Sequence, residues 1–437
     1  MTVAVHLSLK QKLILCCYSL LWMLIVPFTF CHFALQFLRR KSGYSLLRLS
    51  RYGMLSKTSI TTDGTLIHCA SVGEVVAIQG LVESLLNSKP EHPITISTAT
   101  TTGAERVKLL FANRVNHVYL PYDFPLFMRV FINKLQPKKV LINEMELWPN
   151  LCHTCYRNNI PLYIVNGRMS DKSAKTYQKF PSLFSPMFSR ITGICAQGQR
   201  DYDNYLELGI NPKKLTLTNN IKFDLNMSEA DLNMAATIES TFDINDRAIL
   251  VAGSTHEPEE QILLDAYLSL QKDFPTLLLI MVPRHPQRFE KVHQLLKKQN
   301  IKINLMSTSQ ACSETTQVLL CDKMGQLRSI YALADIAFVG GSFAQRGGHN
   351  ALEPAAVGVP IIMGPSRYNN PAICLALETA NALRNVAHAE DIVSVCQHWL
   401  KHPEIKATDG QAGKQVLQQN GGAINKTLEV IASAATT

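Results

Sequence analysis

Short runs of apolar and β-branched residues alternate with amphipathic stretches along most of the chain. Runs that are apolar on both faces are typical of strands in a parallel sheet with helices on either side, so the pattern predicts an α/β fold. In the first half of the chain the predicted strands are residues 66–70, 94–98, 117–120, 140–143 and 162–165. In the second half they are residues 249–252, 277–282, 318–321, 336–339 and 360–363.

The alternation is interrupted once, between about residues 227 and 246, where acidic residues such as Glu229 and Asp243 replace the apolar runs. We interpret this segment as a linker between two doubly wound, Rossmann-like domains, residues 39–228 and 229–437. In such sheets ligands bind outside the carboxyl ends of the strands. The sequence therefore predicts two domains that face one cleft. The pattern at the end of the chain also predicts a last helix over about residues 410–434.

Residues 13–38 form a long apolar stretch without Lys, Arg, Asp or Glu. At ~1.5 Å per residue a helix of this length can cross a bilayer, so residues 1–38 are predicted to be a membrane anchor. An interfacial helix is the alternative, because Pro27, His32 and Gln36 interrupt the stretch. The excess of basic residues after the stretch favours a cytoplasmic location for the rest of the chain. The basic residues are Lys10 and Lys12 before it, and Arg39, Arg40, Lys41, Arg48, Arg51 and Lys57 after it.

The composition narrows the class of protein only in part. With 437 residues, 46% of them hydrophobic, the chain can bury two cores. Its net charge of +9 suits a membrane surface, a phosphorylated lipid, a nucleotide or nucleic acid, and does not choose among them. The 11 cysteines have no regular spacing, which is typical of reduced thiols in a cytosolic compartment. Cys152 and Cys155 could form half of a zinc site, but no second pair follows at a suitable spacing, so we predict no metal.

Polar residues follow several predicted strands of the first half. Glu74 lies at the start of a predicted helix, where a carboxylate could be a general base or could simply favour the helix N-terminus. Glu144 and Glu146 follow a buried strand, and two acids in such a place need partners, which favours a functional role. Arg168 and Lys222 lie in loops expected at the same edge of the sheet, and both could instead pair with neighbouring acids.

The second half offers an anion site that lacks the GxxxxGK[ST] phosphate loop. Arg284 follows a predicted strand and could bind a phosphate bidentately, or form a surface ion pair. The loop at 340–354 is rich in glycine, so its backbone N–H groups could face an anion, and Glu353 could accept both hydroxyls of a ribose. The HEPEE segment is a poor zinc motif, and Ser254 and Glu257 fit a helix-capping box instead.

Taken in order, these motifs resemble the Kdo transferase family, which adds 3-deoxy-D-manno-octulosonic acid (Kdo) to lipid A precursors. The resemblance covers nearly the whole chain. The motifs that carry it are ASVGE, NEMELWPN, NGRMS, NIKFD, GSTHEPEE, PRHPQRF, DKMGQL, FVGGSF, GGHNALEPAA and MGP. It implies a GT-B architecture with an N-terminal acceptor domain and a C-terminal CMP-Kdo domain. It also implies an inverting transfer of Kdo from CMP-Kdo to a tetraacyldisaccharide 4'-bisphosphate in lipopolysaccharide biosynthesis.

The resemblance also implies roles for particular residues. Glu74 is similar to the family's base, which deprotonates the acceptor hydroxyl, and Glu144 and Lys222 are similar to its transition-state stabilising residues. The positions that match the family's CMP-binding residues are Pro283, Arg284, Met324, Gly325, Gln326, Asn350, Ala351, Leu352 and Glu353. The family usually carries an acid where Gln326 stands.

The implied partners are CMP-Kdo, the lipid A precursor and the bacterial inner membrane, with the catalytic domains on the cytoplasmic side. CMP-Kdo is a substrate, and we expect no cofactor, because Arg284, Lys222 and helix N-termini can screen its phosphate. One alternative is another GT-B transferase that uses a UDP-sugar on a membrane lipid. A second is a membrane-tethered nucleic-acid-binding protein. The globular part lacks basic runs interleaved with aromatic residues, so we expect no nucleic-acid partner.

Overall fold

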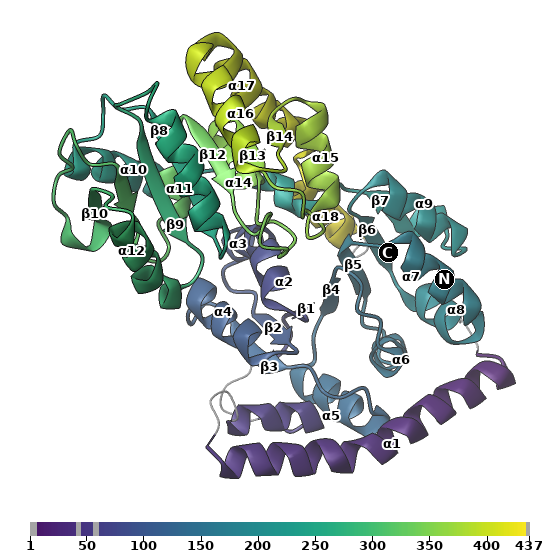
Figure 1. Cartoon of the computed structure of the whole chain (residues 1–437). Coiled ribbons are helices and arrows are strands. Elements are labelled where there is room, and N and C mark those ends of the chain that lie inside the picture. Colours follow the sequence, from purple (N-terminus) through teal and green to yellow (C-terminus); the bar gives the residue numbers. More distant parts are fainter. Residues whose placement is uncertain (1–6, 41–44, 56–60, 434–437) are drawn as a thin grey trace. The chain divides into compact units, whose positions relative to one another are not determined.

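The chain folds into two compact units, each built around a seven-stranded parallel sheet (Figure 1). The computed structural model describes residues 7–40, 45–55 and 61–433, so Lys41 and Lys57 lie outside the described residues. The first unit comprises Met1–Asp224 and Gly421–Thr437, and the second comprises Leu225–Asn420. The predicted α/β class is confirmed.

The first sheet has the strand order β3-β2-β1-β4-β5-β6-β7. The strand order changes direction between β1 and β4, which is where ligands bind in doubly wound folds. The strands are β1 (Thr65–Cys69), β2 (Ile94–Thr98), β3 (Asn116–Tyr119), β4 (Lys139–Asn143), β5 (Leu162–Gly167), β6 (Gly193–Ala196) and β7 (Leu215–Leu217).

Helices cover both faces of the first sheet. Successive strand residues point to opposite faces, so Leu66 of β1 packs in one core and Ile67 in the other. Hydroxyl caps at Ser71, Thr100 and Ser170 start α2, α4 and α7. The helices are α2 (Val72–Ala77), α3 (Gln79–Ser88), α4 (Thr101–Phe111), α5 (Pro125–Leu135), α6 (Pro149–Arg157), α7 (Asp171–Lys179), α8 (Pro181–Arg190), α9 (Gln199–Glu207) and α18 (Ala423–Ser433).

The apolar N-terminal stretch forms the single helix α1 (Leu9–Leu38), as predicted. Ser8 and Gln11 form a capping box at its start, and Pro27 lies inside it. The helix is long and apolar enough to cross a membrane by length and composition. It runs along the first unit beside α6 and α8, and the 3₁₀ helix η1 (Leu46–Tyr52) follows it (Figure 1).

The second sheet has the strand order β10-β11-β9-β8-β12-β13-β14. Its order changes direction between β8 and β12, which again marks the expected ligand position. The strands are β8 (Ile249–Thr255), β9 (Leu278–Pro283), β10 (Ile303–Leu305), β11 (Val318–Leu320), β12 (Ile336–Val339), β13 (Ile361–Met363) and β14 (Leu383–Asn385).

A buried core with Tyr267 and Trp399 packs against the second sheet. Trp399 donates its indole N–H to Asp409, 2.9 Å away, which satisfies the buried ring nitrogen. The helices of this unit are α10 (Glu229–Phe242), α11 (Glu259–Leu270), α12 (Phe289–Lys298), α13 (Leu327–Tyr331), α14 (Leu352–Val357), α15 (Pro371–Thr379), α16 (Ala389–Lys401) and α17 (Pro403–Asn420).

Two segments differ from the sequence prediction. The expected linker at 227–246 is mostly helix α10, which starts at a capping box of Ser228 and Asp231. The expected last helix is two helices, and the second of them, α18, belongs to the first unit. Asp224 accounts for this return, because its carboxylate accepts the backbone N–H groups at the start of α18. The compact units therefore differ from the expected division into 39–228 and 229–437.

Candidate functional site

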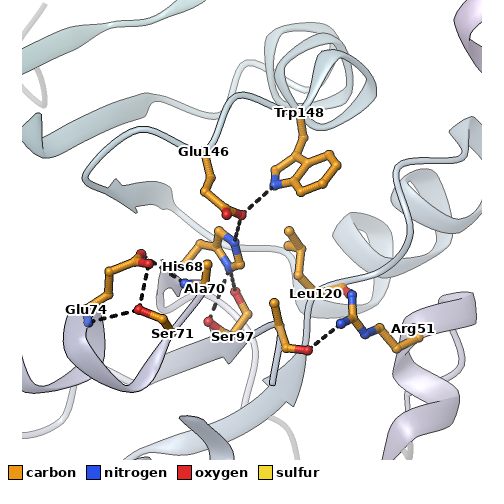
Figure 2. A network of polar contacts seen from close by, with 10 residues as sticks. Arg51, His68, Ala70, Ser71, Glu74, Ser97, Leu120, Glu146 and Trp148 are labelled. Carbon is orange, nitrogen blue, oxygen red and sulfur yellow. Dashed lines mark hydrogen bonds and ion pairs between the residues drawn. The ribbon is translucent and has the colours of Figure 1, made fainter. Parts of the chain in front are cut away.

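Glu74 lies at the carboxyl end of β1, in the first turn of α2. Its carboxylate accepts the Ala70 backbone N–H and the Ser71 hydroxyl, each at 3.0 Å (Figure 2). Burial raises the pKa of Glu74, the Ala70 N–H opposes this rise, and the negative charge of Glu144 adds to it. Glu74 is thus a half-buried carboxyl group that is held in one position and takes up a proton more readily than a free glutamate.

Glu144 follows β4 at the neighbouring strand end. Its backbone is in the left-handed region with a φ of +57°, and its N–H donates to Val165 at 3.0 Å. It shares with Glu74 a cavity of about 310 Å³. The other residues that line this cavity are Met145, Glu146, Arg168, Ser170 and Ser173.

Glu146 is the centre of a polar network at the edge of this cavity (Figure 2). It accepts a hydrogen bond from Trp148 Nε1 at 3.2 Å and lies 3.2 Å from Nε2 of the buried His68. Nδ1 of His68 lies 3.0 Å from the Ser97 hydroxyl and 3.2 Å from the Ser97 backbone oxygen, so Ser97 holds the ring with Nε2 toward Glu146. The hydrogen bond from His68 is the main reason that the pKa of Glu146 is lowered.

Lys222 lies in the 3₁₀ helix η3 (Ile221–Asp224), which follows β7. The side chain of Asn166, near the end of β5, accepts the Ile221 N–H at 3.2 Å and so joins this strand to η3. Burial lowers the pKa of Lys222, the charge of Glu144 raises it, and that of Arg168 lowers it. Lys222 is therefore close enough to Glu144 and Arg168 of the cavity for their charges to act on it.

In the second unit, Arg284 and Glu353 lie at the carboxyl edge of the sheet. Pro283 ends β9, and Arg284 is exposed directly after it. Glu353 lies in the first turn of α14, within hydrogen-bonding reach of Asn350 at 3.5 Å. Burial raises the pKa of Glu353, and the charge of Arg328 opposes this rise. The other predicted positions near α14 are Ala351 and Leu352, both buried.

Met324, Gly325 and Gln326 form the loop between β11 and α13. Met324 is exposed, Gly325 has a φ of +84°, and Gln326 is the residue before the first turn of α13. Pro283 thus ends a strand of the second sheet, and the other predicted CMP-binding positions lie in loops or helix starts of the same unit.

Three backbone N–H groups at the start of the glycine-rich loop after β12 are already bound within the protein. The backbone N–H groups of Gly341, Ser342 and Phe343 donate to the carboxylate of Glu259 at 2.8–2.9 Å. Glu259 is fully buried and also accepts the His256 N–H at 2.9 Å. A side chain of the protein itself therefore occupies this loop.

Three histidines cluster beside Arg284. Nε2 of His256 lies 2.9 Å from Nε2 of His349, with their rings stacked at 5.1 Å, and His285 lies 5.4 Å from His256. One of the two nitrogens must donate and the other accept, so at least one of these rings has a bare nitrogen. Burial is the main reason that the pKa values of His256 and His349 are lowered to about 4, and the neighbouring histidines and arginines contribute to this shift. Among the described residues, no group of three or more His, Cys, Asp and Glu side chains is arranged to hold a metal ion.

Comparison with known proteins identifies the family. Residues 48–225 match a model described as 3-deoxy-D-manno-octulosonic-acid transferase (kdotransferase). A 3-deoxy-D-manno-octulosonic acid transferase of Haemophilus influenzae is 40% identical over 417 residues, which cover 95% of this chain and 97% of that protein. The chain belongs to the Kdo transferase family. It is a glycosyltransferase that transfers Kdo in lipopolysaccharide biosynthesis.

Solved structures of known proteins resemble this Kdo transferase in fold. The UDP-GlcNAc 2-epimerase of Neisseria meningitidis has a TM-score of 0.58 at 14% identity and covers 85% of this chain and 100% of its own. This likeness shows the GT-B-like fold alone. The C-terminal CMP-Kdo binding domain of WaaA from Acinetobacter baumannii is 34% identical, with a TM-score of 0.42, and covers 44% of this chain and 100% of its own.

Sequence reasoning missed several polar residues that build the site of this Kdo transferase. Ser254 lies in β8 and Pro258 precedes α11, so the predicted capping box of Ser254 and Glu257 is wrong. The neighbouring Glu259 is the acid that binds backbone N–H groups, and three of these groups, those of Gly341, Ser342 and Phe343, are more than 80 residues away in the sequence. His68 and Ser97 were also missed, since each belongs to a strand that reads as core. His68 and Ser97 are brought together by the register of β1 and β2, which the sequence of either strand alone does not specify.

Replacement of Glu259 by Gln tests the loop contact. The amide offers one acceptor oxygen in place of two, so several buried N–H groups lose their partner, at a cost of ~1–3 kcal/mol for each buried group left unsatisfied. We expect a lower unfolding temperature and weaker binding of CMP, measured by scanning and titration calorimetry. The control is Glu257→Gln, because Glu257 is exposed and pairs with Arg288 at the surface. An equal effect of both substitutions would contradict the role of Glu259.

Proposed function

We propose that this Kdo transferase moves Kdo from CMP-Kdo to a hydroxyl group of a tetraacyldisaccharide 4'-bisphosphate, with inversion at the anomeric carbon. The observation that carries the proposal is the position of Glu74. It is half-buried, fixed by Ala70 and Ser71, and lines a polar cavity together with Glu144 and Arg168.

Glu74 is the general base in this scheme. Its carboxylate takes the proton of the acceptor hydroxyl, and the hydroxyl oxygen forms a bond to the anomeric carbon of Kdo. The bond from that carbon to the phosphate oxygen breaks, and CMP leaves with the electron pair. The raised pKa of Glu74 supports this role, because a base is most effective when its pKa lies close to the working pH. A single direct displacement inverts the configuration.

Glu144 and Lys222 stabilise the transition state. Glu144 lies in the same cavity as the base, and its charge acts on both Glu74 and Lys222. The Lys222 ammonium can balance the negative charge that develops on the departing phosphate, because a preorganised charge in a partly buried site is effective there. The scheme requires that the first unit's cavity and the second unit's loops face one cleft in the working enzyme.

CMP-Kdo is held by the second unit. Arg284, exposed at the end of β9, binds the phosphate, and Glu353 accepts the ribose hydroxyls. The remaining contacts to CMP come from Pro283, Met324, Gly325, Gln326, Asn350, Ala351 and Leu352. The scheme uses no metal or other cofactor, because Arg284 and Lys222 supply the positive charge.

The enzyme works at the inner membrane, on its cytoplasmic side. Support comes from α1, an apolar helix long enough to anchor the chain, and from the excess of basic residues after it. The acceptor is itself a lipid, so attachment brings the first unit to its substrate. We expect no nucleic-acid partner.

Glu74→Gln tests the base. The amide cannot accept the proton, so we expect turnover to fall by about 10²–10⁴-fold, the usual contribution of a general base. The affinity for CMP should stay within about twofold, since Glu74 and the CMP loops belong to different units. Mass spectrometry of the product measures turnover, and titration calorimetry measures CMP affinity. Glu83→Gln, which removes a surface acid paired with Arg114, is the control. Near-wild-type turnover of the Glu74 variant would eliminate it as the base.

The pH dependence of kcat/KM provides a second test. The base must be deprotonated, and the pKa of Glu74 is raised above the ordinary value of 4.5, so activity should be lost as the pH falls through a value above 4.5. The charge of Glu144 contributes to this rise. Glu144→Gln should therefore move the acidic limb to lower pH, whatever its effect on the maximal rate. A limb that stays in place would show that Glu74 and Glu144 are not coupled.

Arg284→Ala tests the phosphate contact. Loss of a charged hydrogen bond, ~1.5–3 kcal/mol, predicts about 10- to 100-fold weaker binding of CMP-Kdo. Lys297→Ala removes one positive charge from the exposed face of α12 and serves as the control. Unchanged affinity in the Arg284 variant would refute the contact. Titration with UDP alongside CMP distinguishes the two donors, and binding of UDP in preference to CMP would favour a UDP-sugar transferase.

A further inference from the structure

The contacts of α1 with the first unit form a stripe along the helix. The partly buried side chains recur every three or four residues, which places them on one face. Gln11 and Leu15 lie against Pro149 and Arg190 at the N-terminal end. The other side chains of the stripe are Tyr18, Ser19, Trp22, Val26, Thr29 and Phe33.

The middle and the end of the stripe are bound by specific partners. Ser19 lies 3.3 Å from Nδ2 of Asn150, and the Trp22 ring lies 5.6 Å from that of Tyr122. Towards the C-terminal end, the Phe33 ring is 6.2 Å from the ring of Tyr52. The helix is therefore held at its beginning, its middle and its end.

A buried carboxylate anchors the middle of the stripe. Asp123 accepts the backbone N–H groups of Asn150 and Leu151 at 2.8 and 2.9 Å, and the Tyr18 side chain of α1 hydrogen-bonds to it as well. The Asn150 side chain donates to the Asp123 backbone oxygen at 2.6 Å. Buried charges need such partners, so removal of α1 would leave this carboxylate less well satisfied.

The part of α1 that contacts the first unit is longer than the hydrocarbon core of a membrane is thick, so a helix that spanned the membrane could not keep these contacts. From Gln11 to Phe33 the stripe covers 23 residues. The rise between its ends is ~33 Å at ~1.5 Å per residue, which exceeds the ~30 Å hydrocarbon core of a bilayer. A helix that crossed the membrane would carry this length into hydrocarbon. It would then lose Asp123, Asn150 and Arg190 as neighbours, or draw these polar groups into the lipid.

The opposite face of α1 is apolar and uncovered in the first unit. Its exposed fractions are 57% for Leu13, 54% for Leu20, 68% for Leu24, 77% for Phe28 and 54% for Leu35. Such a surface is not stable in water. Basic residues flank both ends, with Lys10 and Lys12 at one and Arg39 and Arg40 at the other. The exposed Leu46 and Leu47 of η1 continue the apolar surface. A lipid layer with anionic head groups fits an apolar strip with basic ends.

We propose that α1 lies in the plane of the membrane, with its contact stripe on the first unit, its opposite face in the acyl boundary, and both ends on the side of the catalytic units. This inference refines the membrane attachment in the proposed function and does not depend on the donor. The contact of α1 with Asn150 lies close in sequence to the cavity of Glu74 and Glu144. Asn150 is in the first turn of α6, two residues after Trp148, which binds Glu146.

The location of the helix N-terminus tests the proposal. A background variant with Cys16→Ala, Cys17→Ala and Cys31→Ala removes the exposed thiols of α1, and Ser8→Cys then adds one thiol at its start. A membrane-impermeant maleimide is applied to intact spheroplasts and to lysed ones. We expect label at position 8 only after lysis, as for the control Ser240→Cys in the second unit. Labelling at position 8 in intact spheroplasts would establish a spanning helix and overturn the proposal.

Cross-linking tests the docked face itself. Ser19→Cys with Asn150→Cys should form a disulfide under mild oxidation in membranes, whereas Leu20→Cys with Asn150→Cys should not, because Leu20 lies on the opposite side of the helix. Kdo transfer by the reduced variants confirms that each is folded. Equal cross-linking of both pairs, or of neither, would contradict the docked stripe. Recovery of the protein in the soluble fraction as a dimer would show that a second copy, not lipid, covers the apolar face.

Discussion

The loops at the carboxyl edges of both sheets depend on carboxylates that bind backbone N–H groups. In a parallel sheet all strands end at the same edge, and the N–H groups of the loops beyond them have no strand partner. Glu259 binds the loop after β12, and Asp123 binds the start of α6. A buried carboxylate is itself costly unless it accepts hydrogen bonds, so each contact satisfies both partners. Glu144 and Glu146 lie in the segment that leads to α6, and Asn350 and Glu353 follow the loop after β12.

This constraint separates acids that hold structure from acids that are available for chemistry. Glu259 is fully buried and its oxygens are occupied by N–H groups. Glu146 is held by His68 and Trp148, and its pKa is lowered, so it remains charged. Glu74 lines the same cavity as Glu146, but its pKa is raised. A carboxyl group that takes up a proton more readily than a free glutamate therefore faces the cavity.

The sequence predicted the parts of the fold that depend on local pattern. Each predicted strand is present because buried parallel strands are apolar on both faces. The strands β6, β7, β10 and β14, with three or four residues each, were missed. The predicted site residues do lie at the sheet edges, and their roles remain proposals. The failures are non-local: Glu259 fills the glycine loop, and Asp224 returns α18 to the first unit across nearly 200 residues of sequence. The hydrophobic pattern around these residues does not predict either contact, because the partners are far apart in the sequence.

The N-terminal helix is another case in which the local sequence does not decide the structure. A helix that touches a protein core on one face and lipid on the other is apolar all round, so its composition is that of a spanning helix. What distinguishes the two is a few side chains, among them Tyr18 and Ser19, which meet Asp123 and Asn150. Since Asn150 lies close after Trp148, the contact that holds the helix also holds the segment that leads to the cavity of Glu74 and Glu144. In the proposed arrangement, the buried polar cluster around Asp123 therefore supports both the docked helix and this segment.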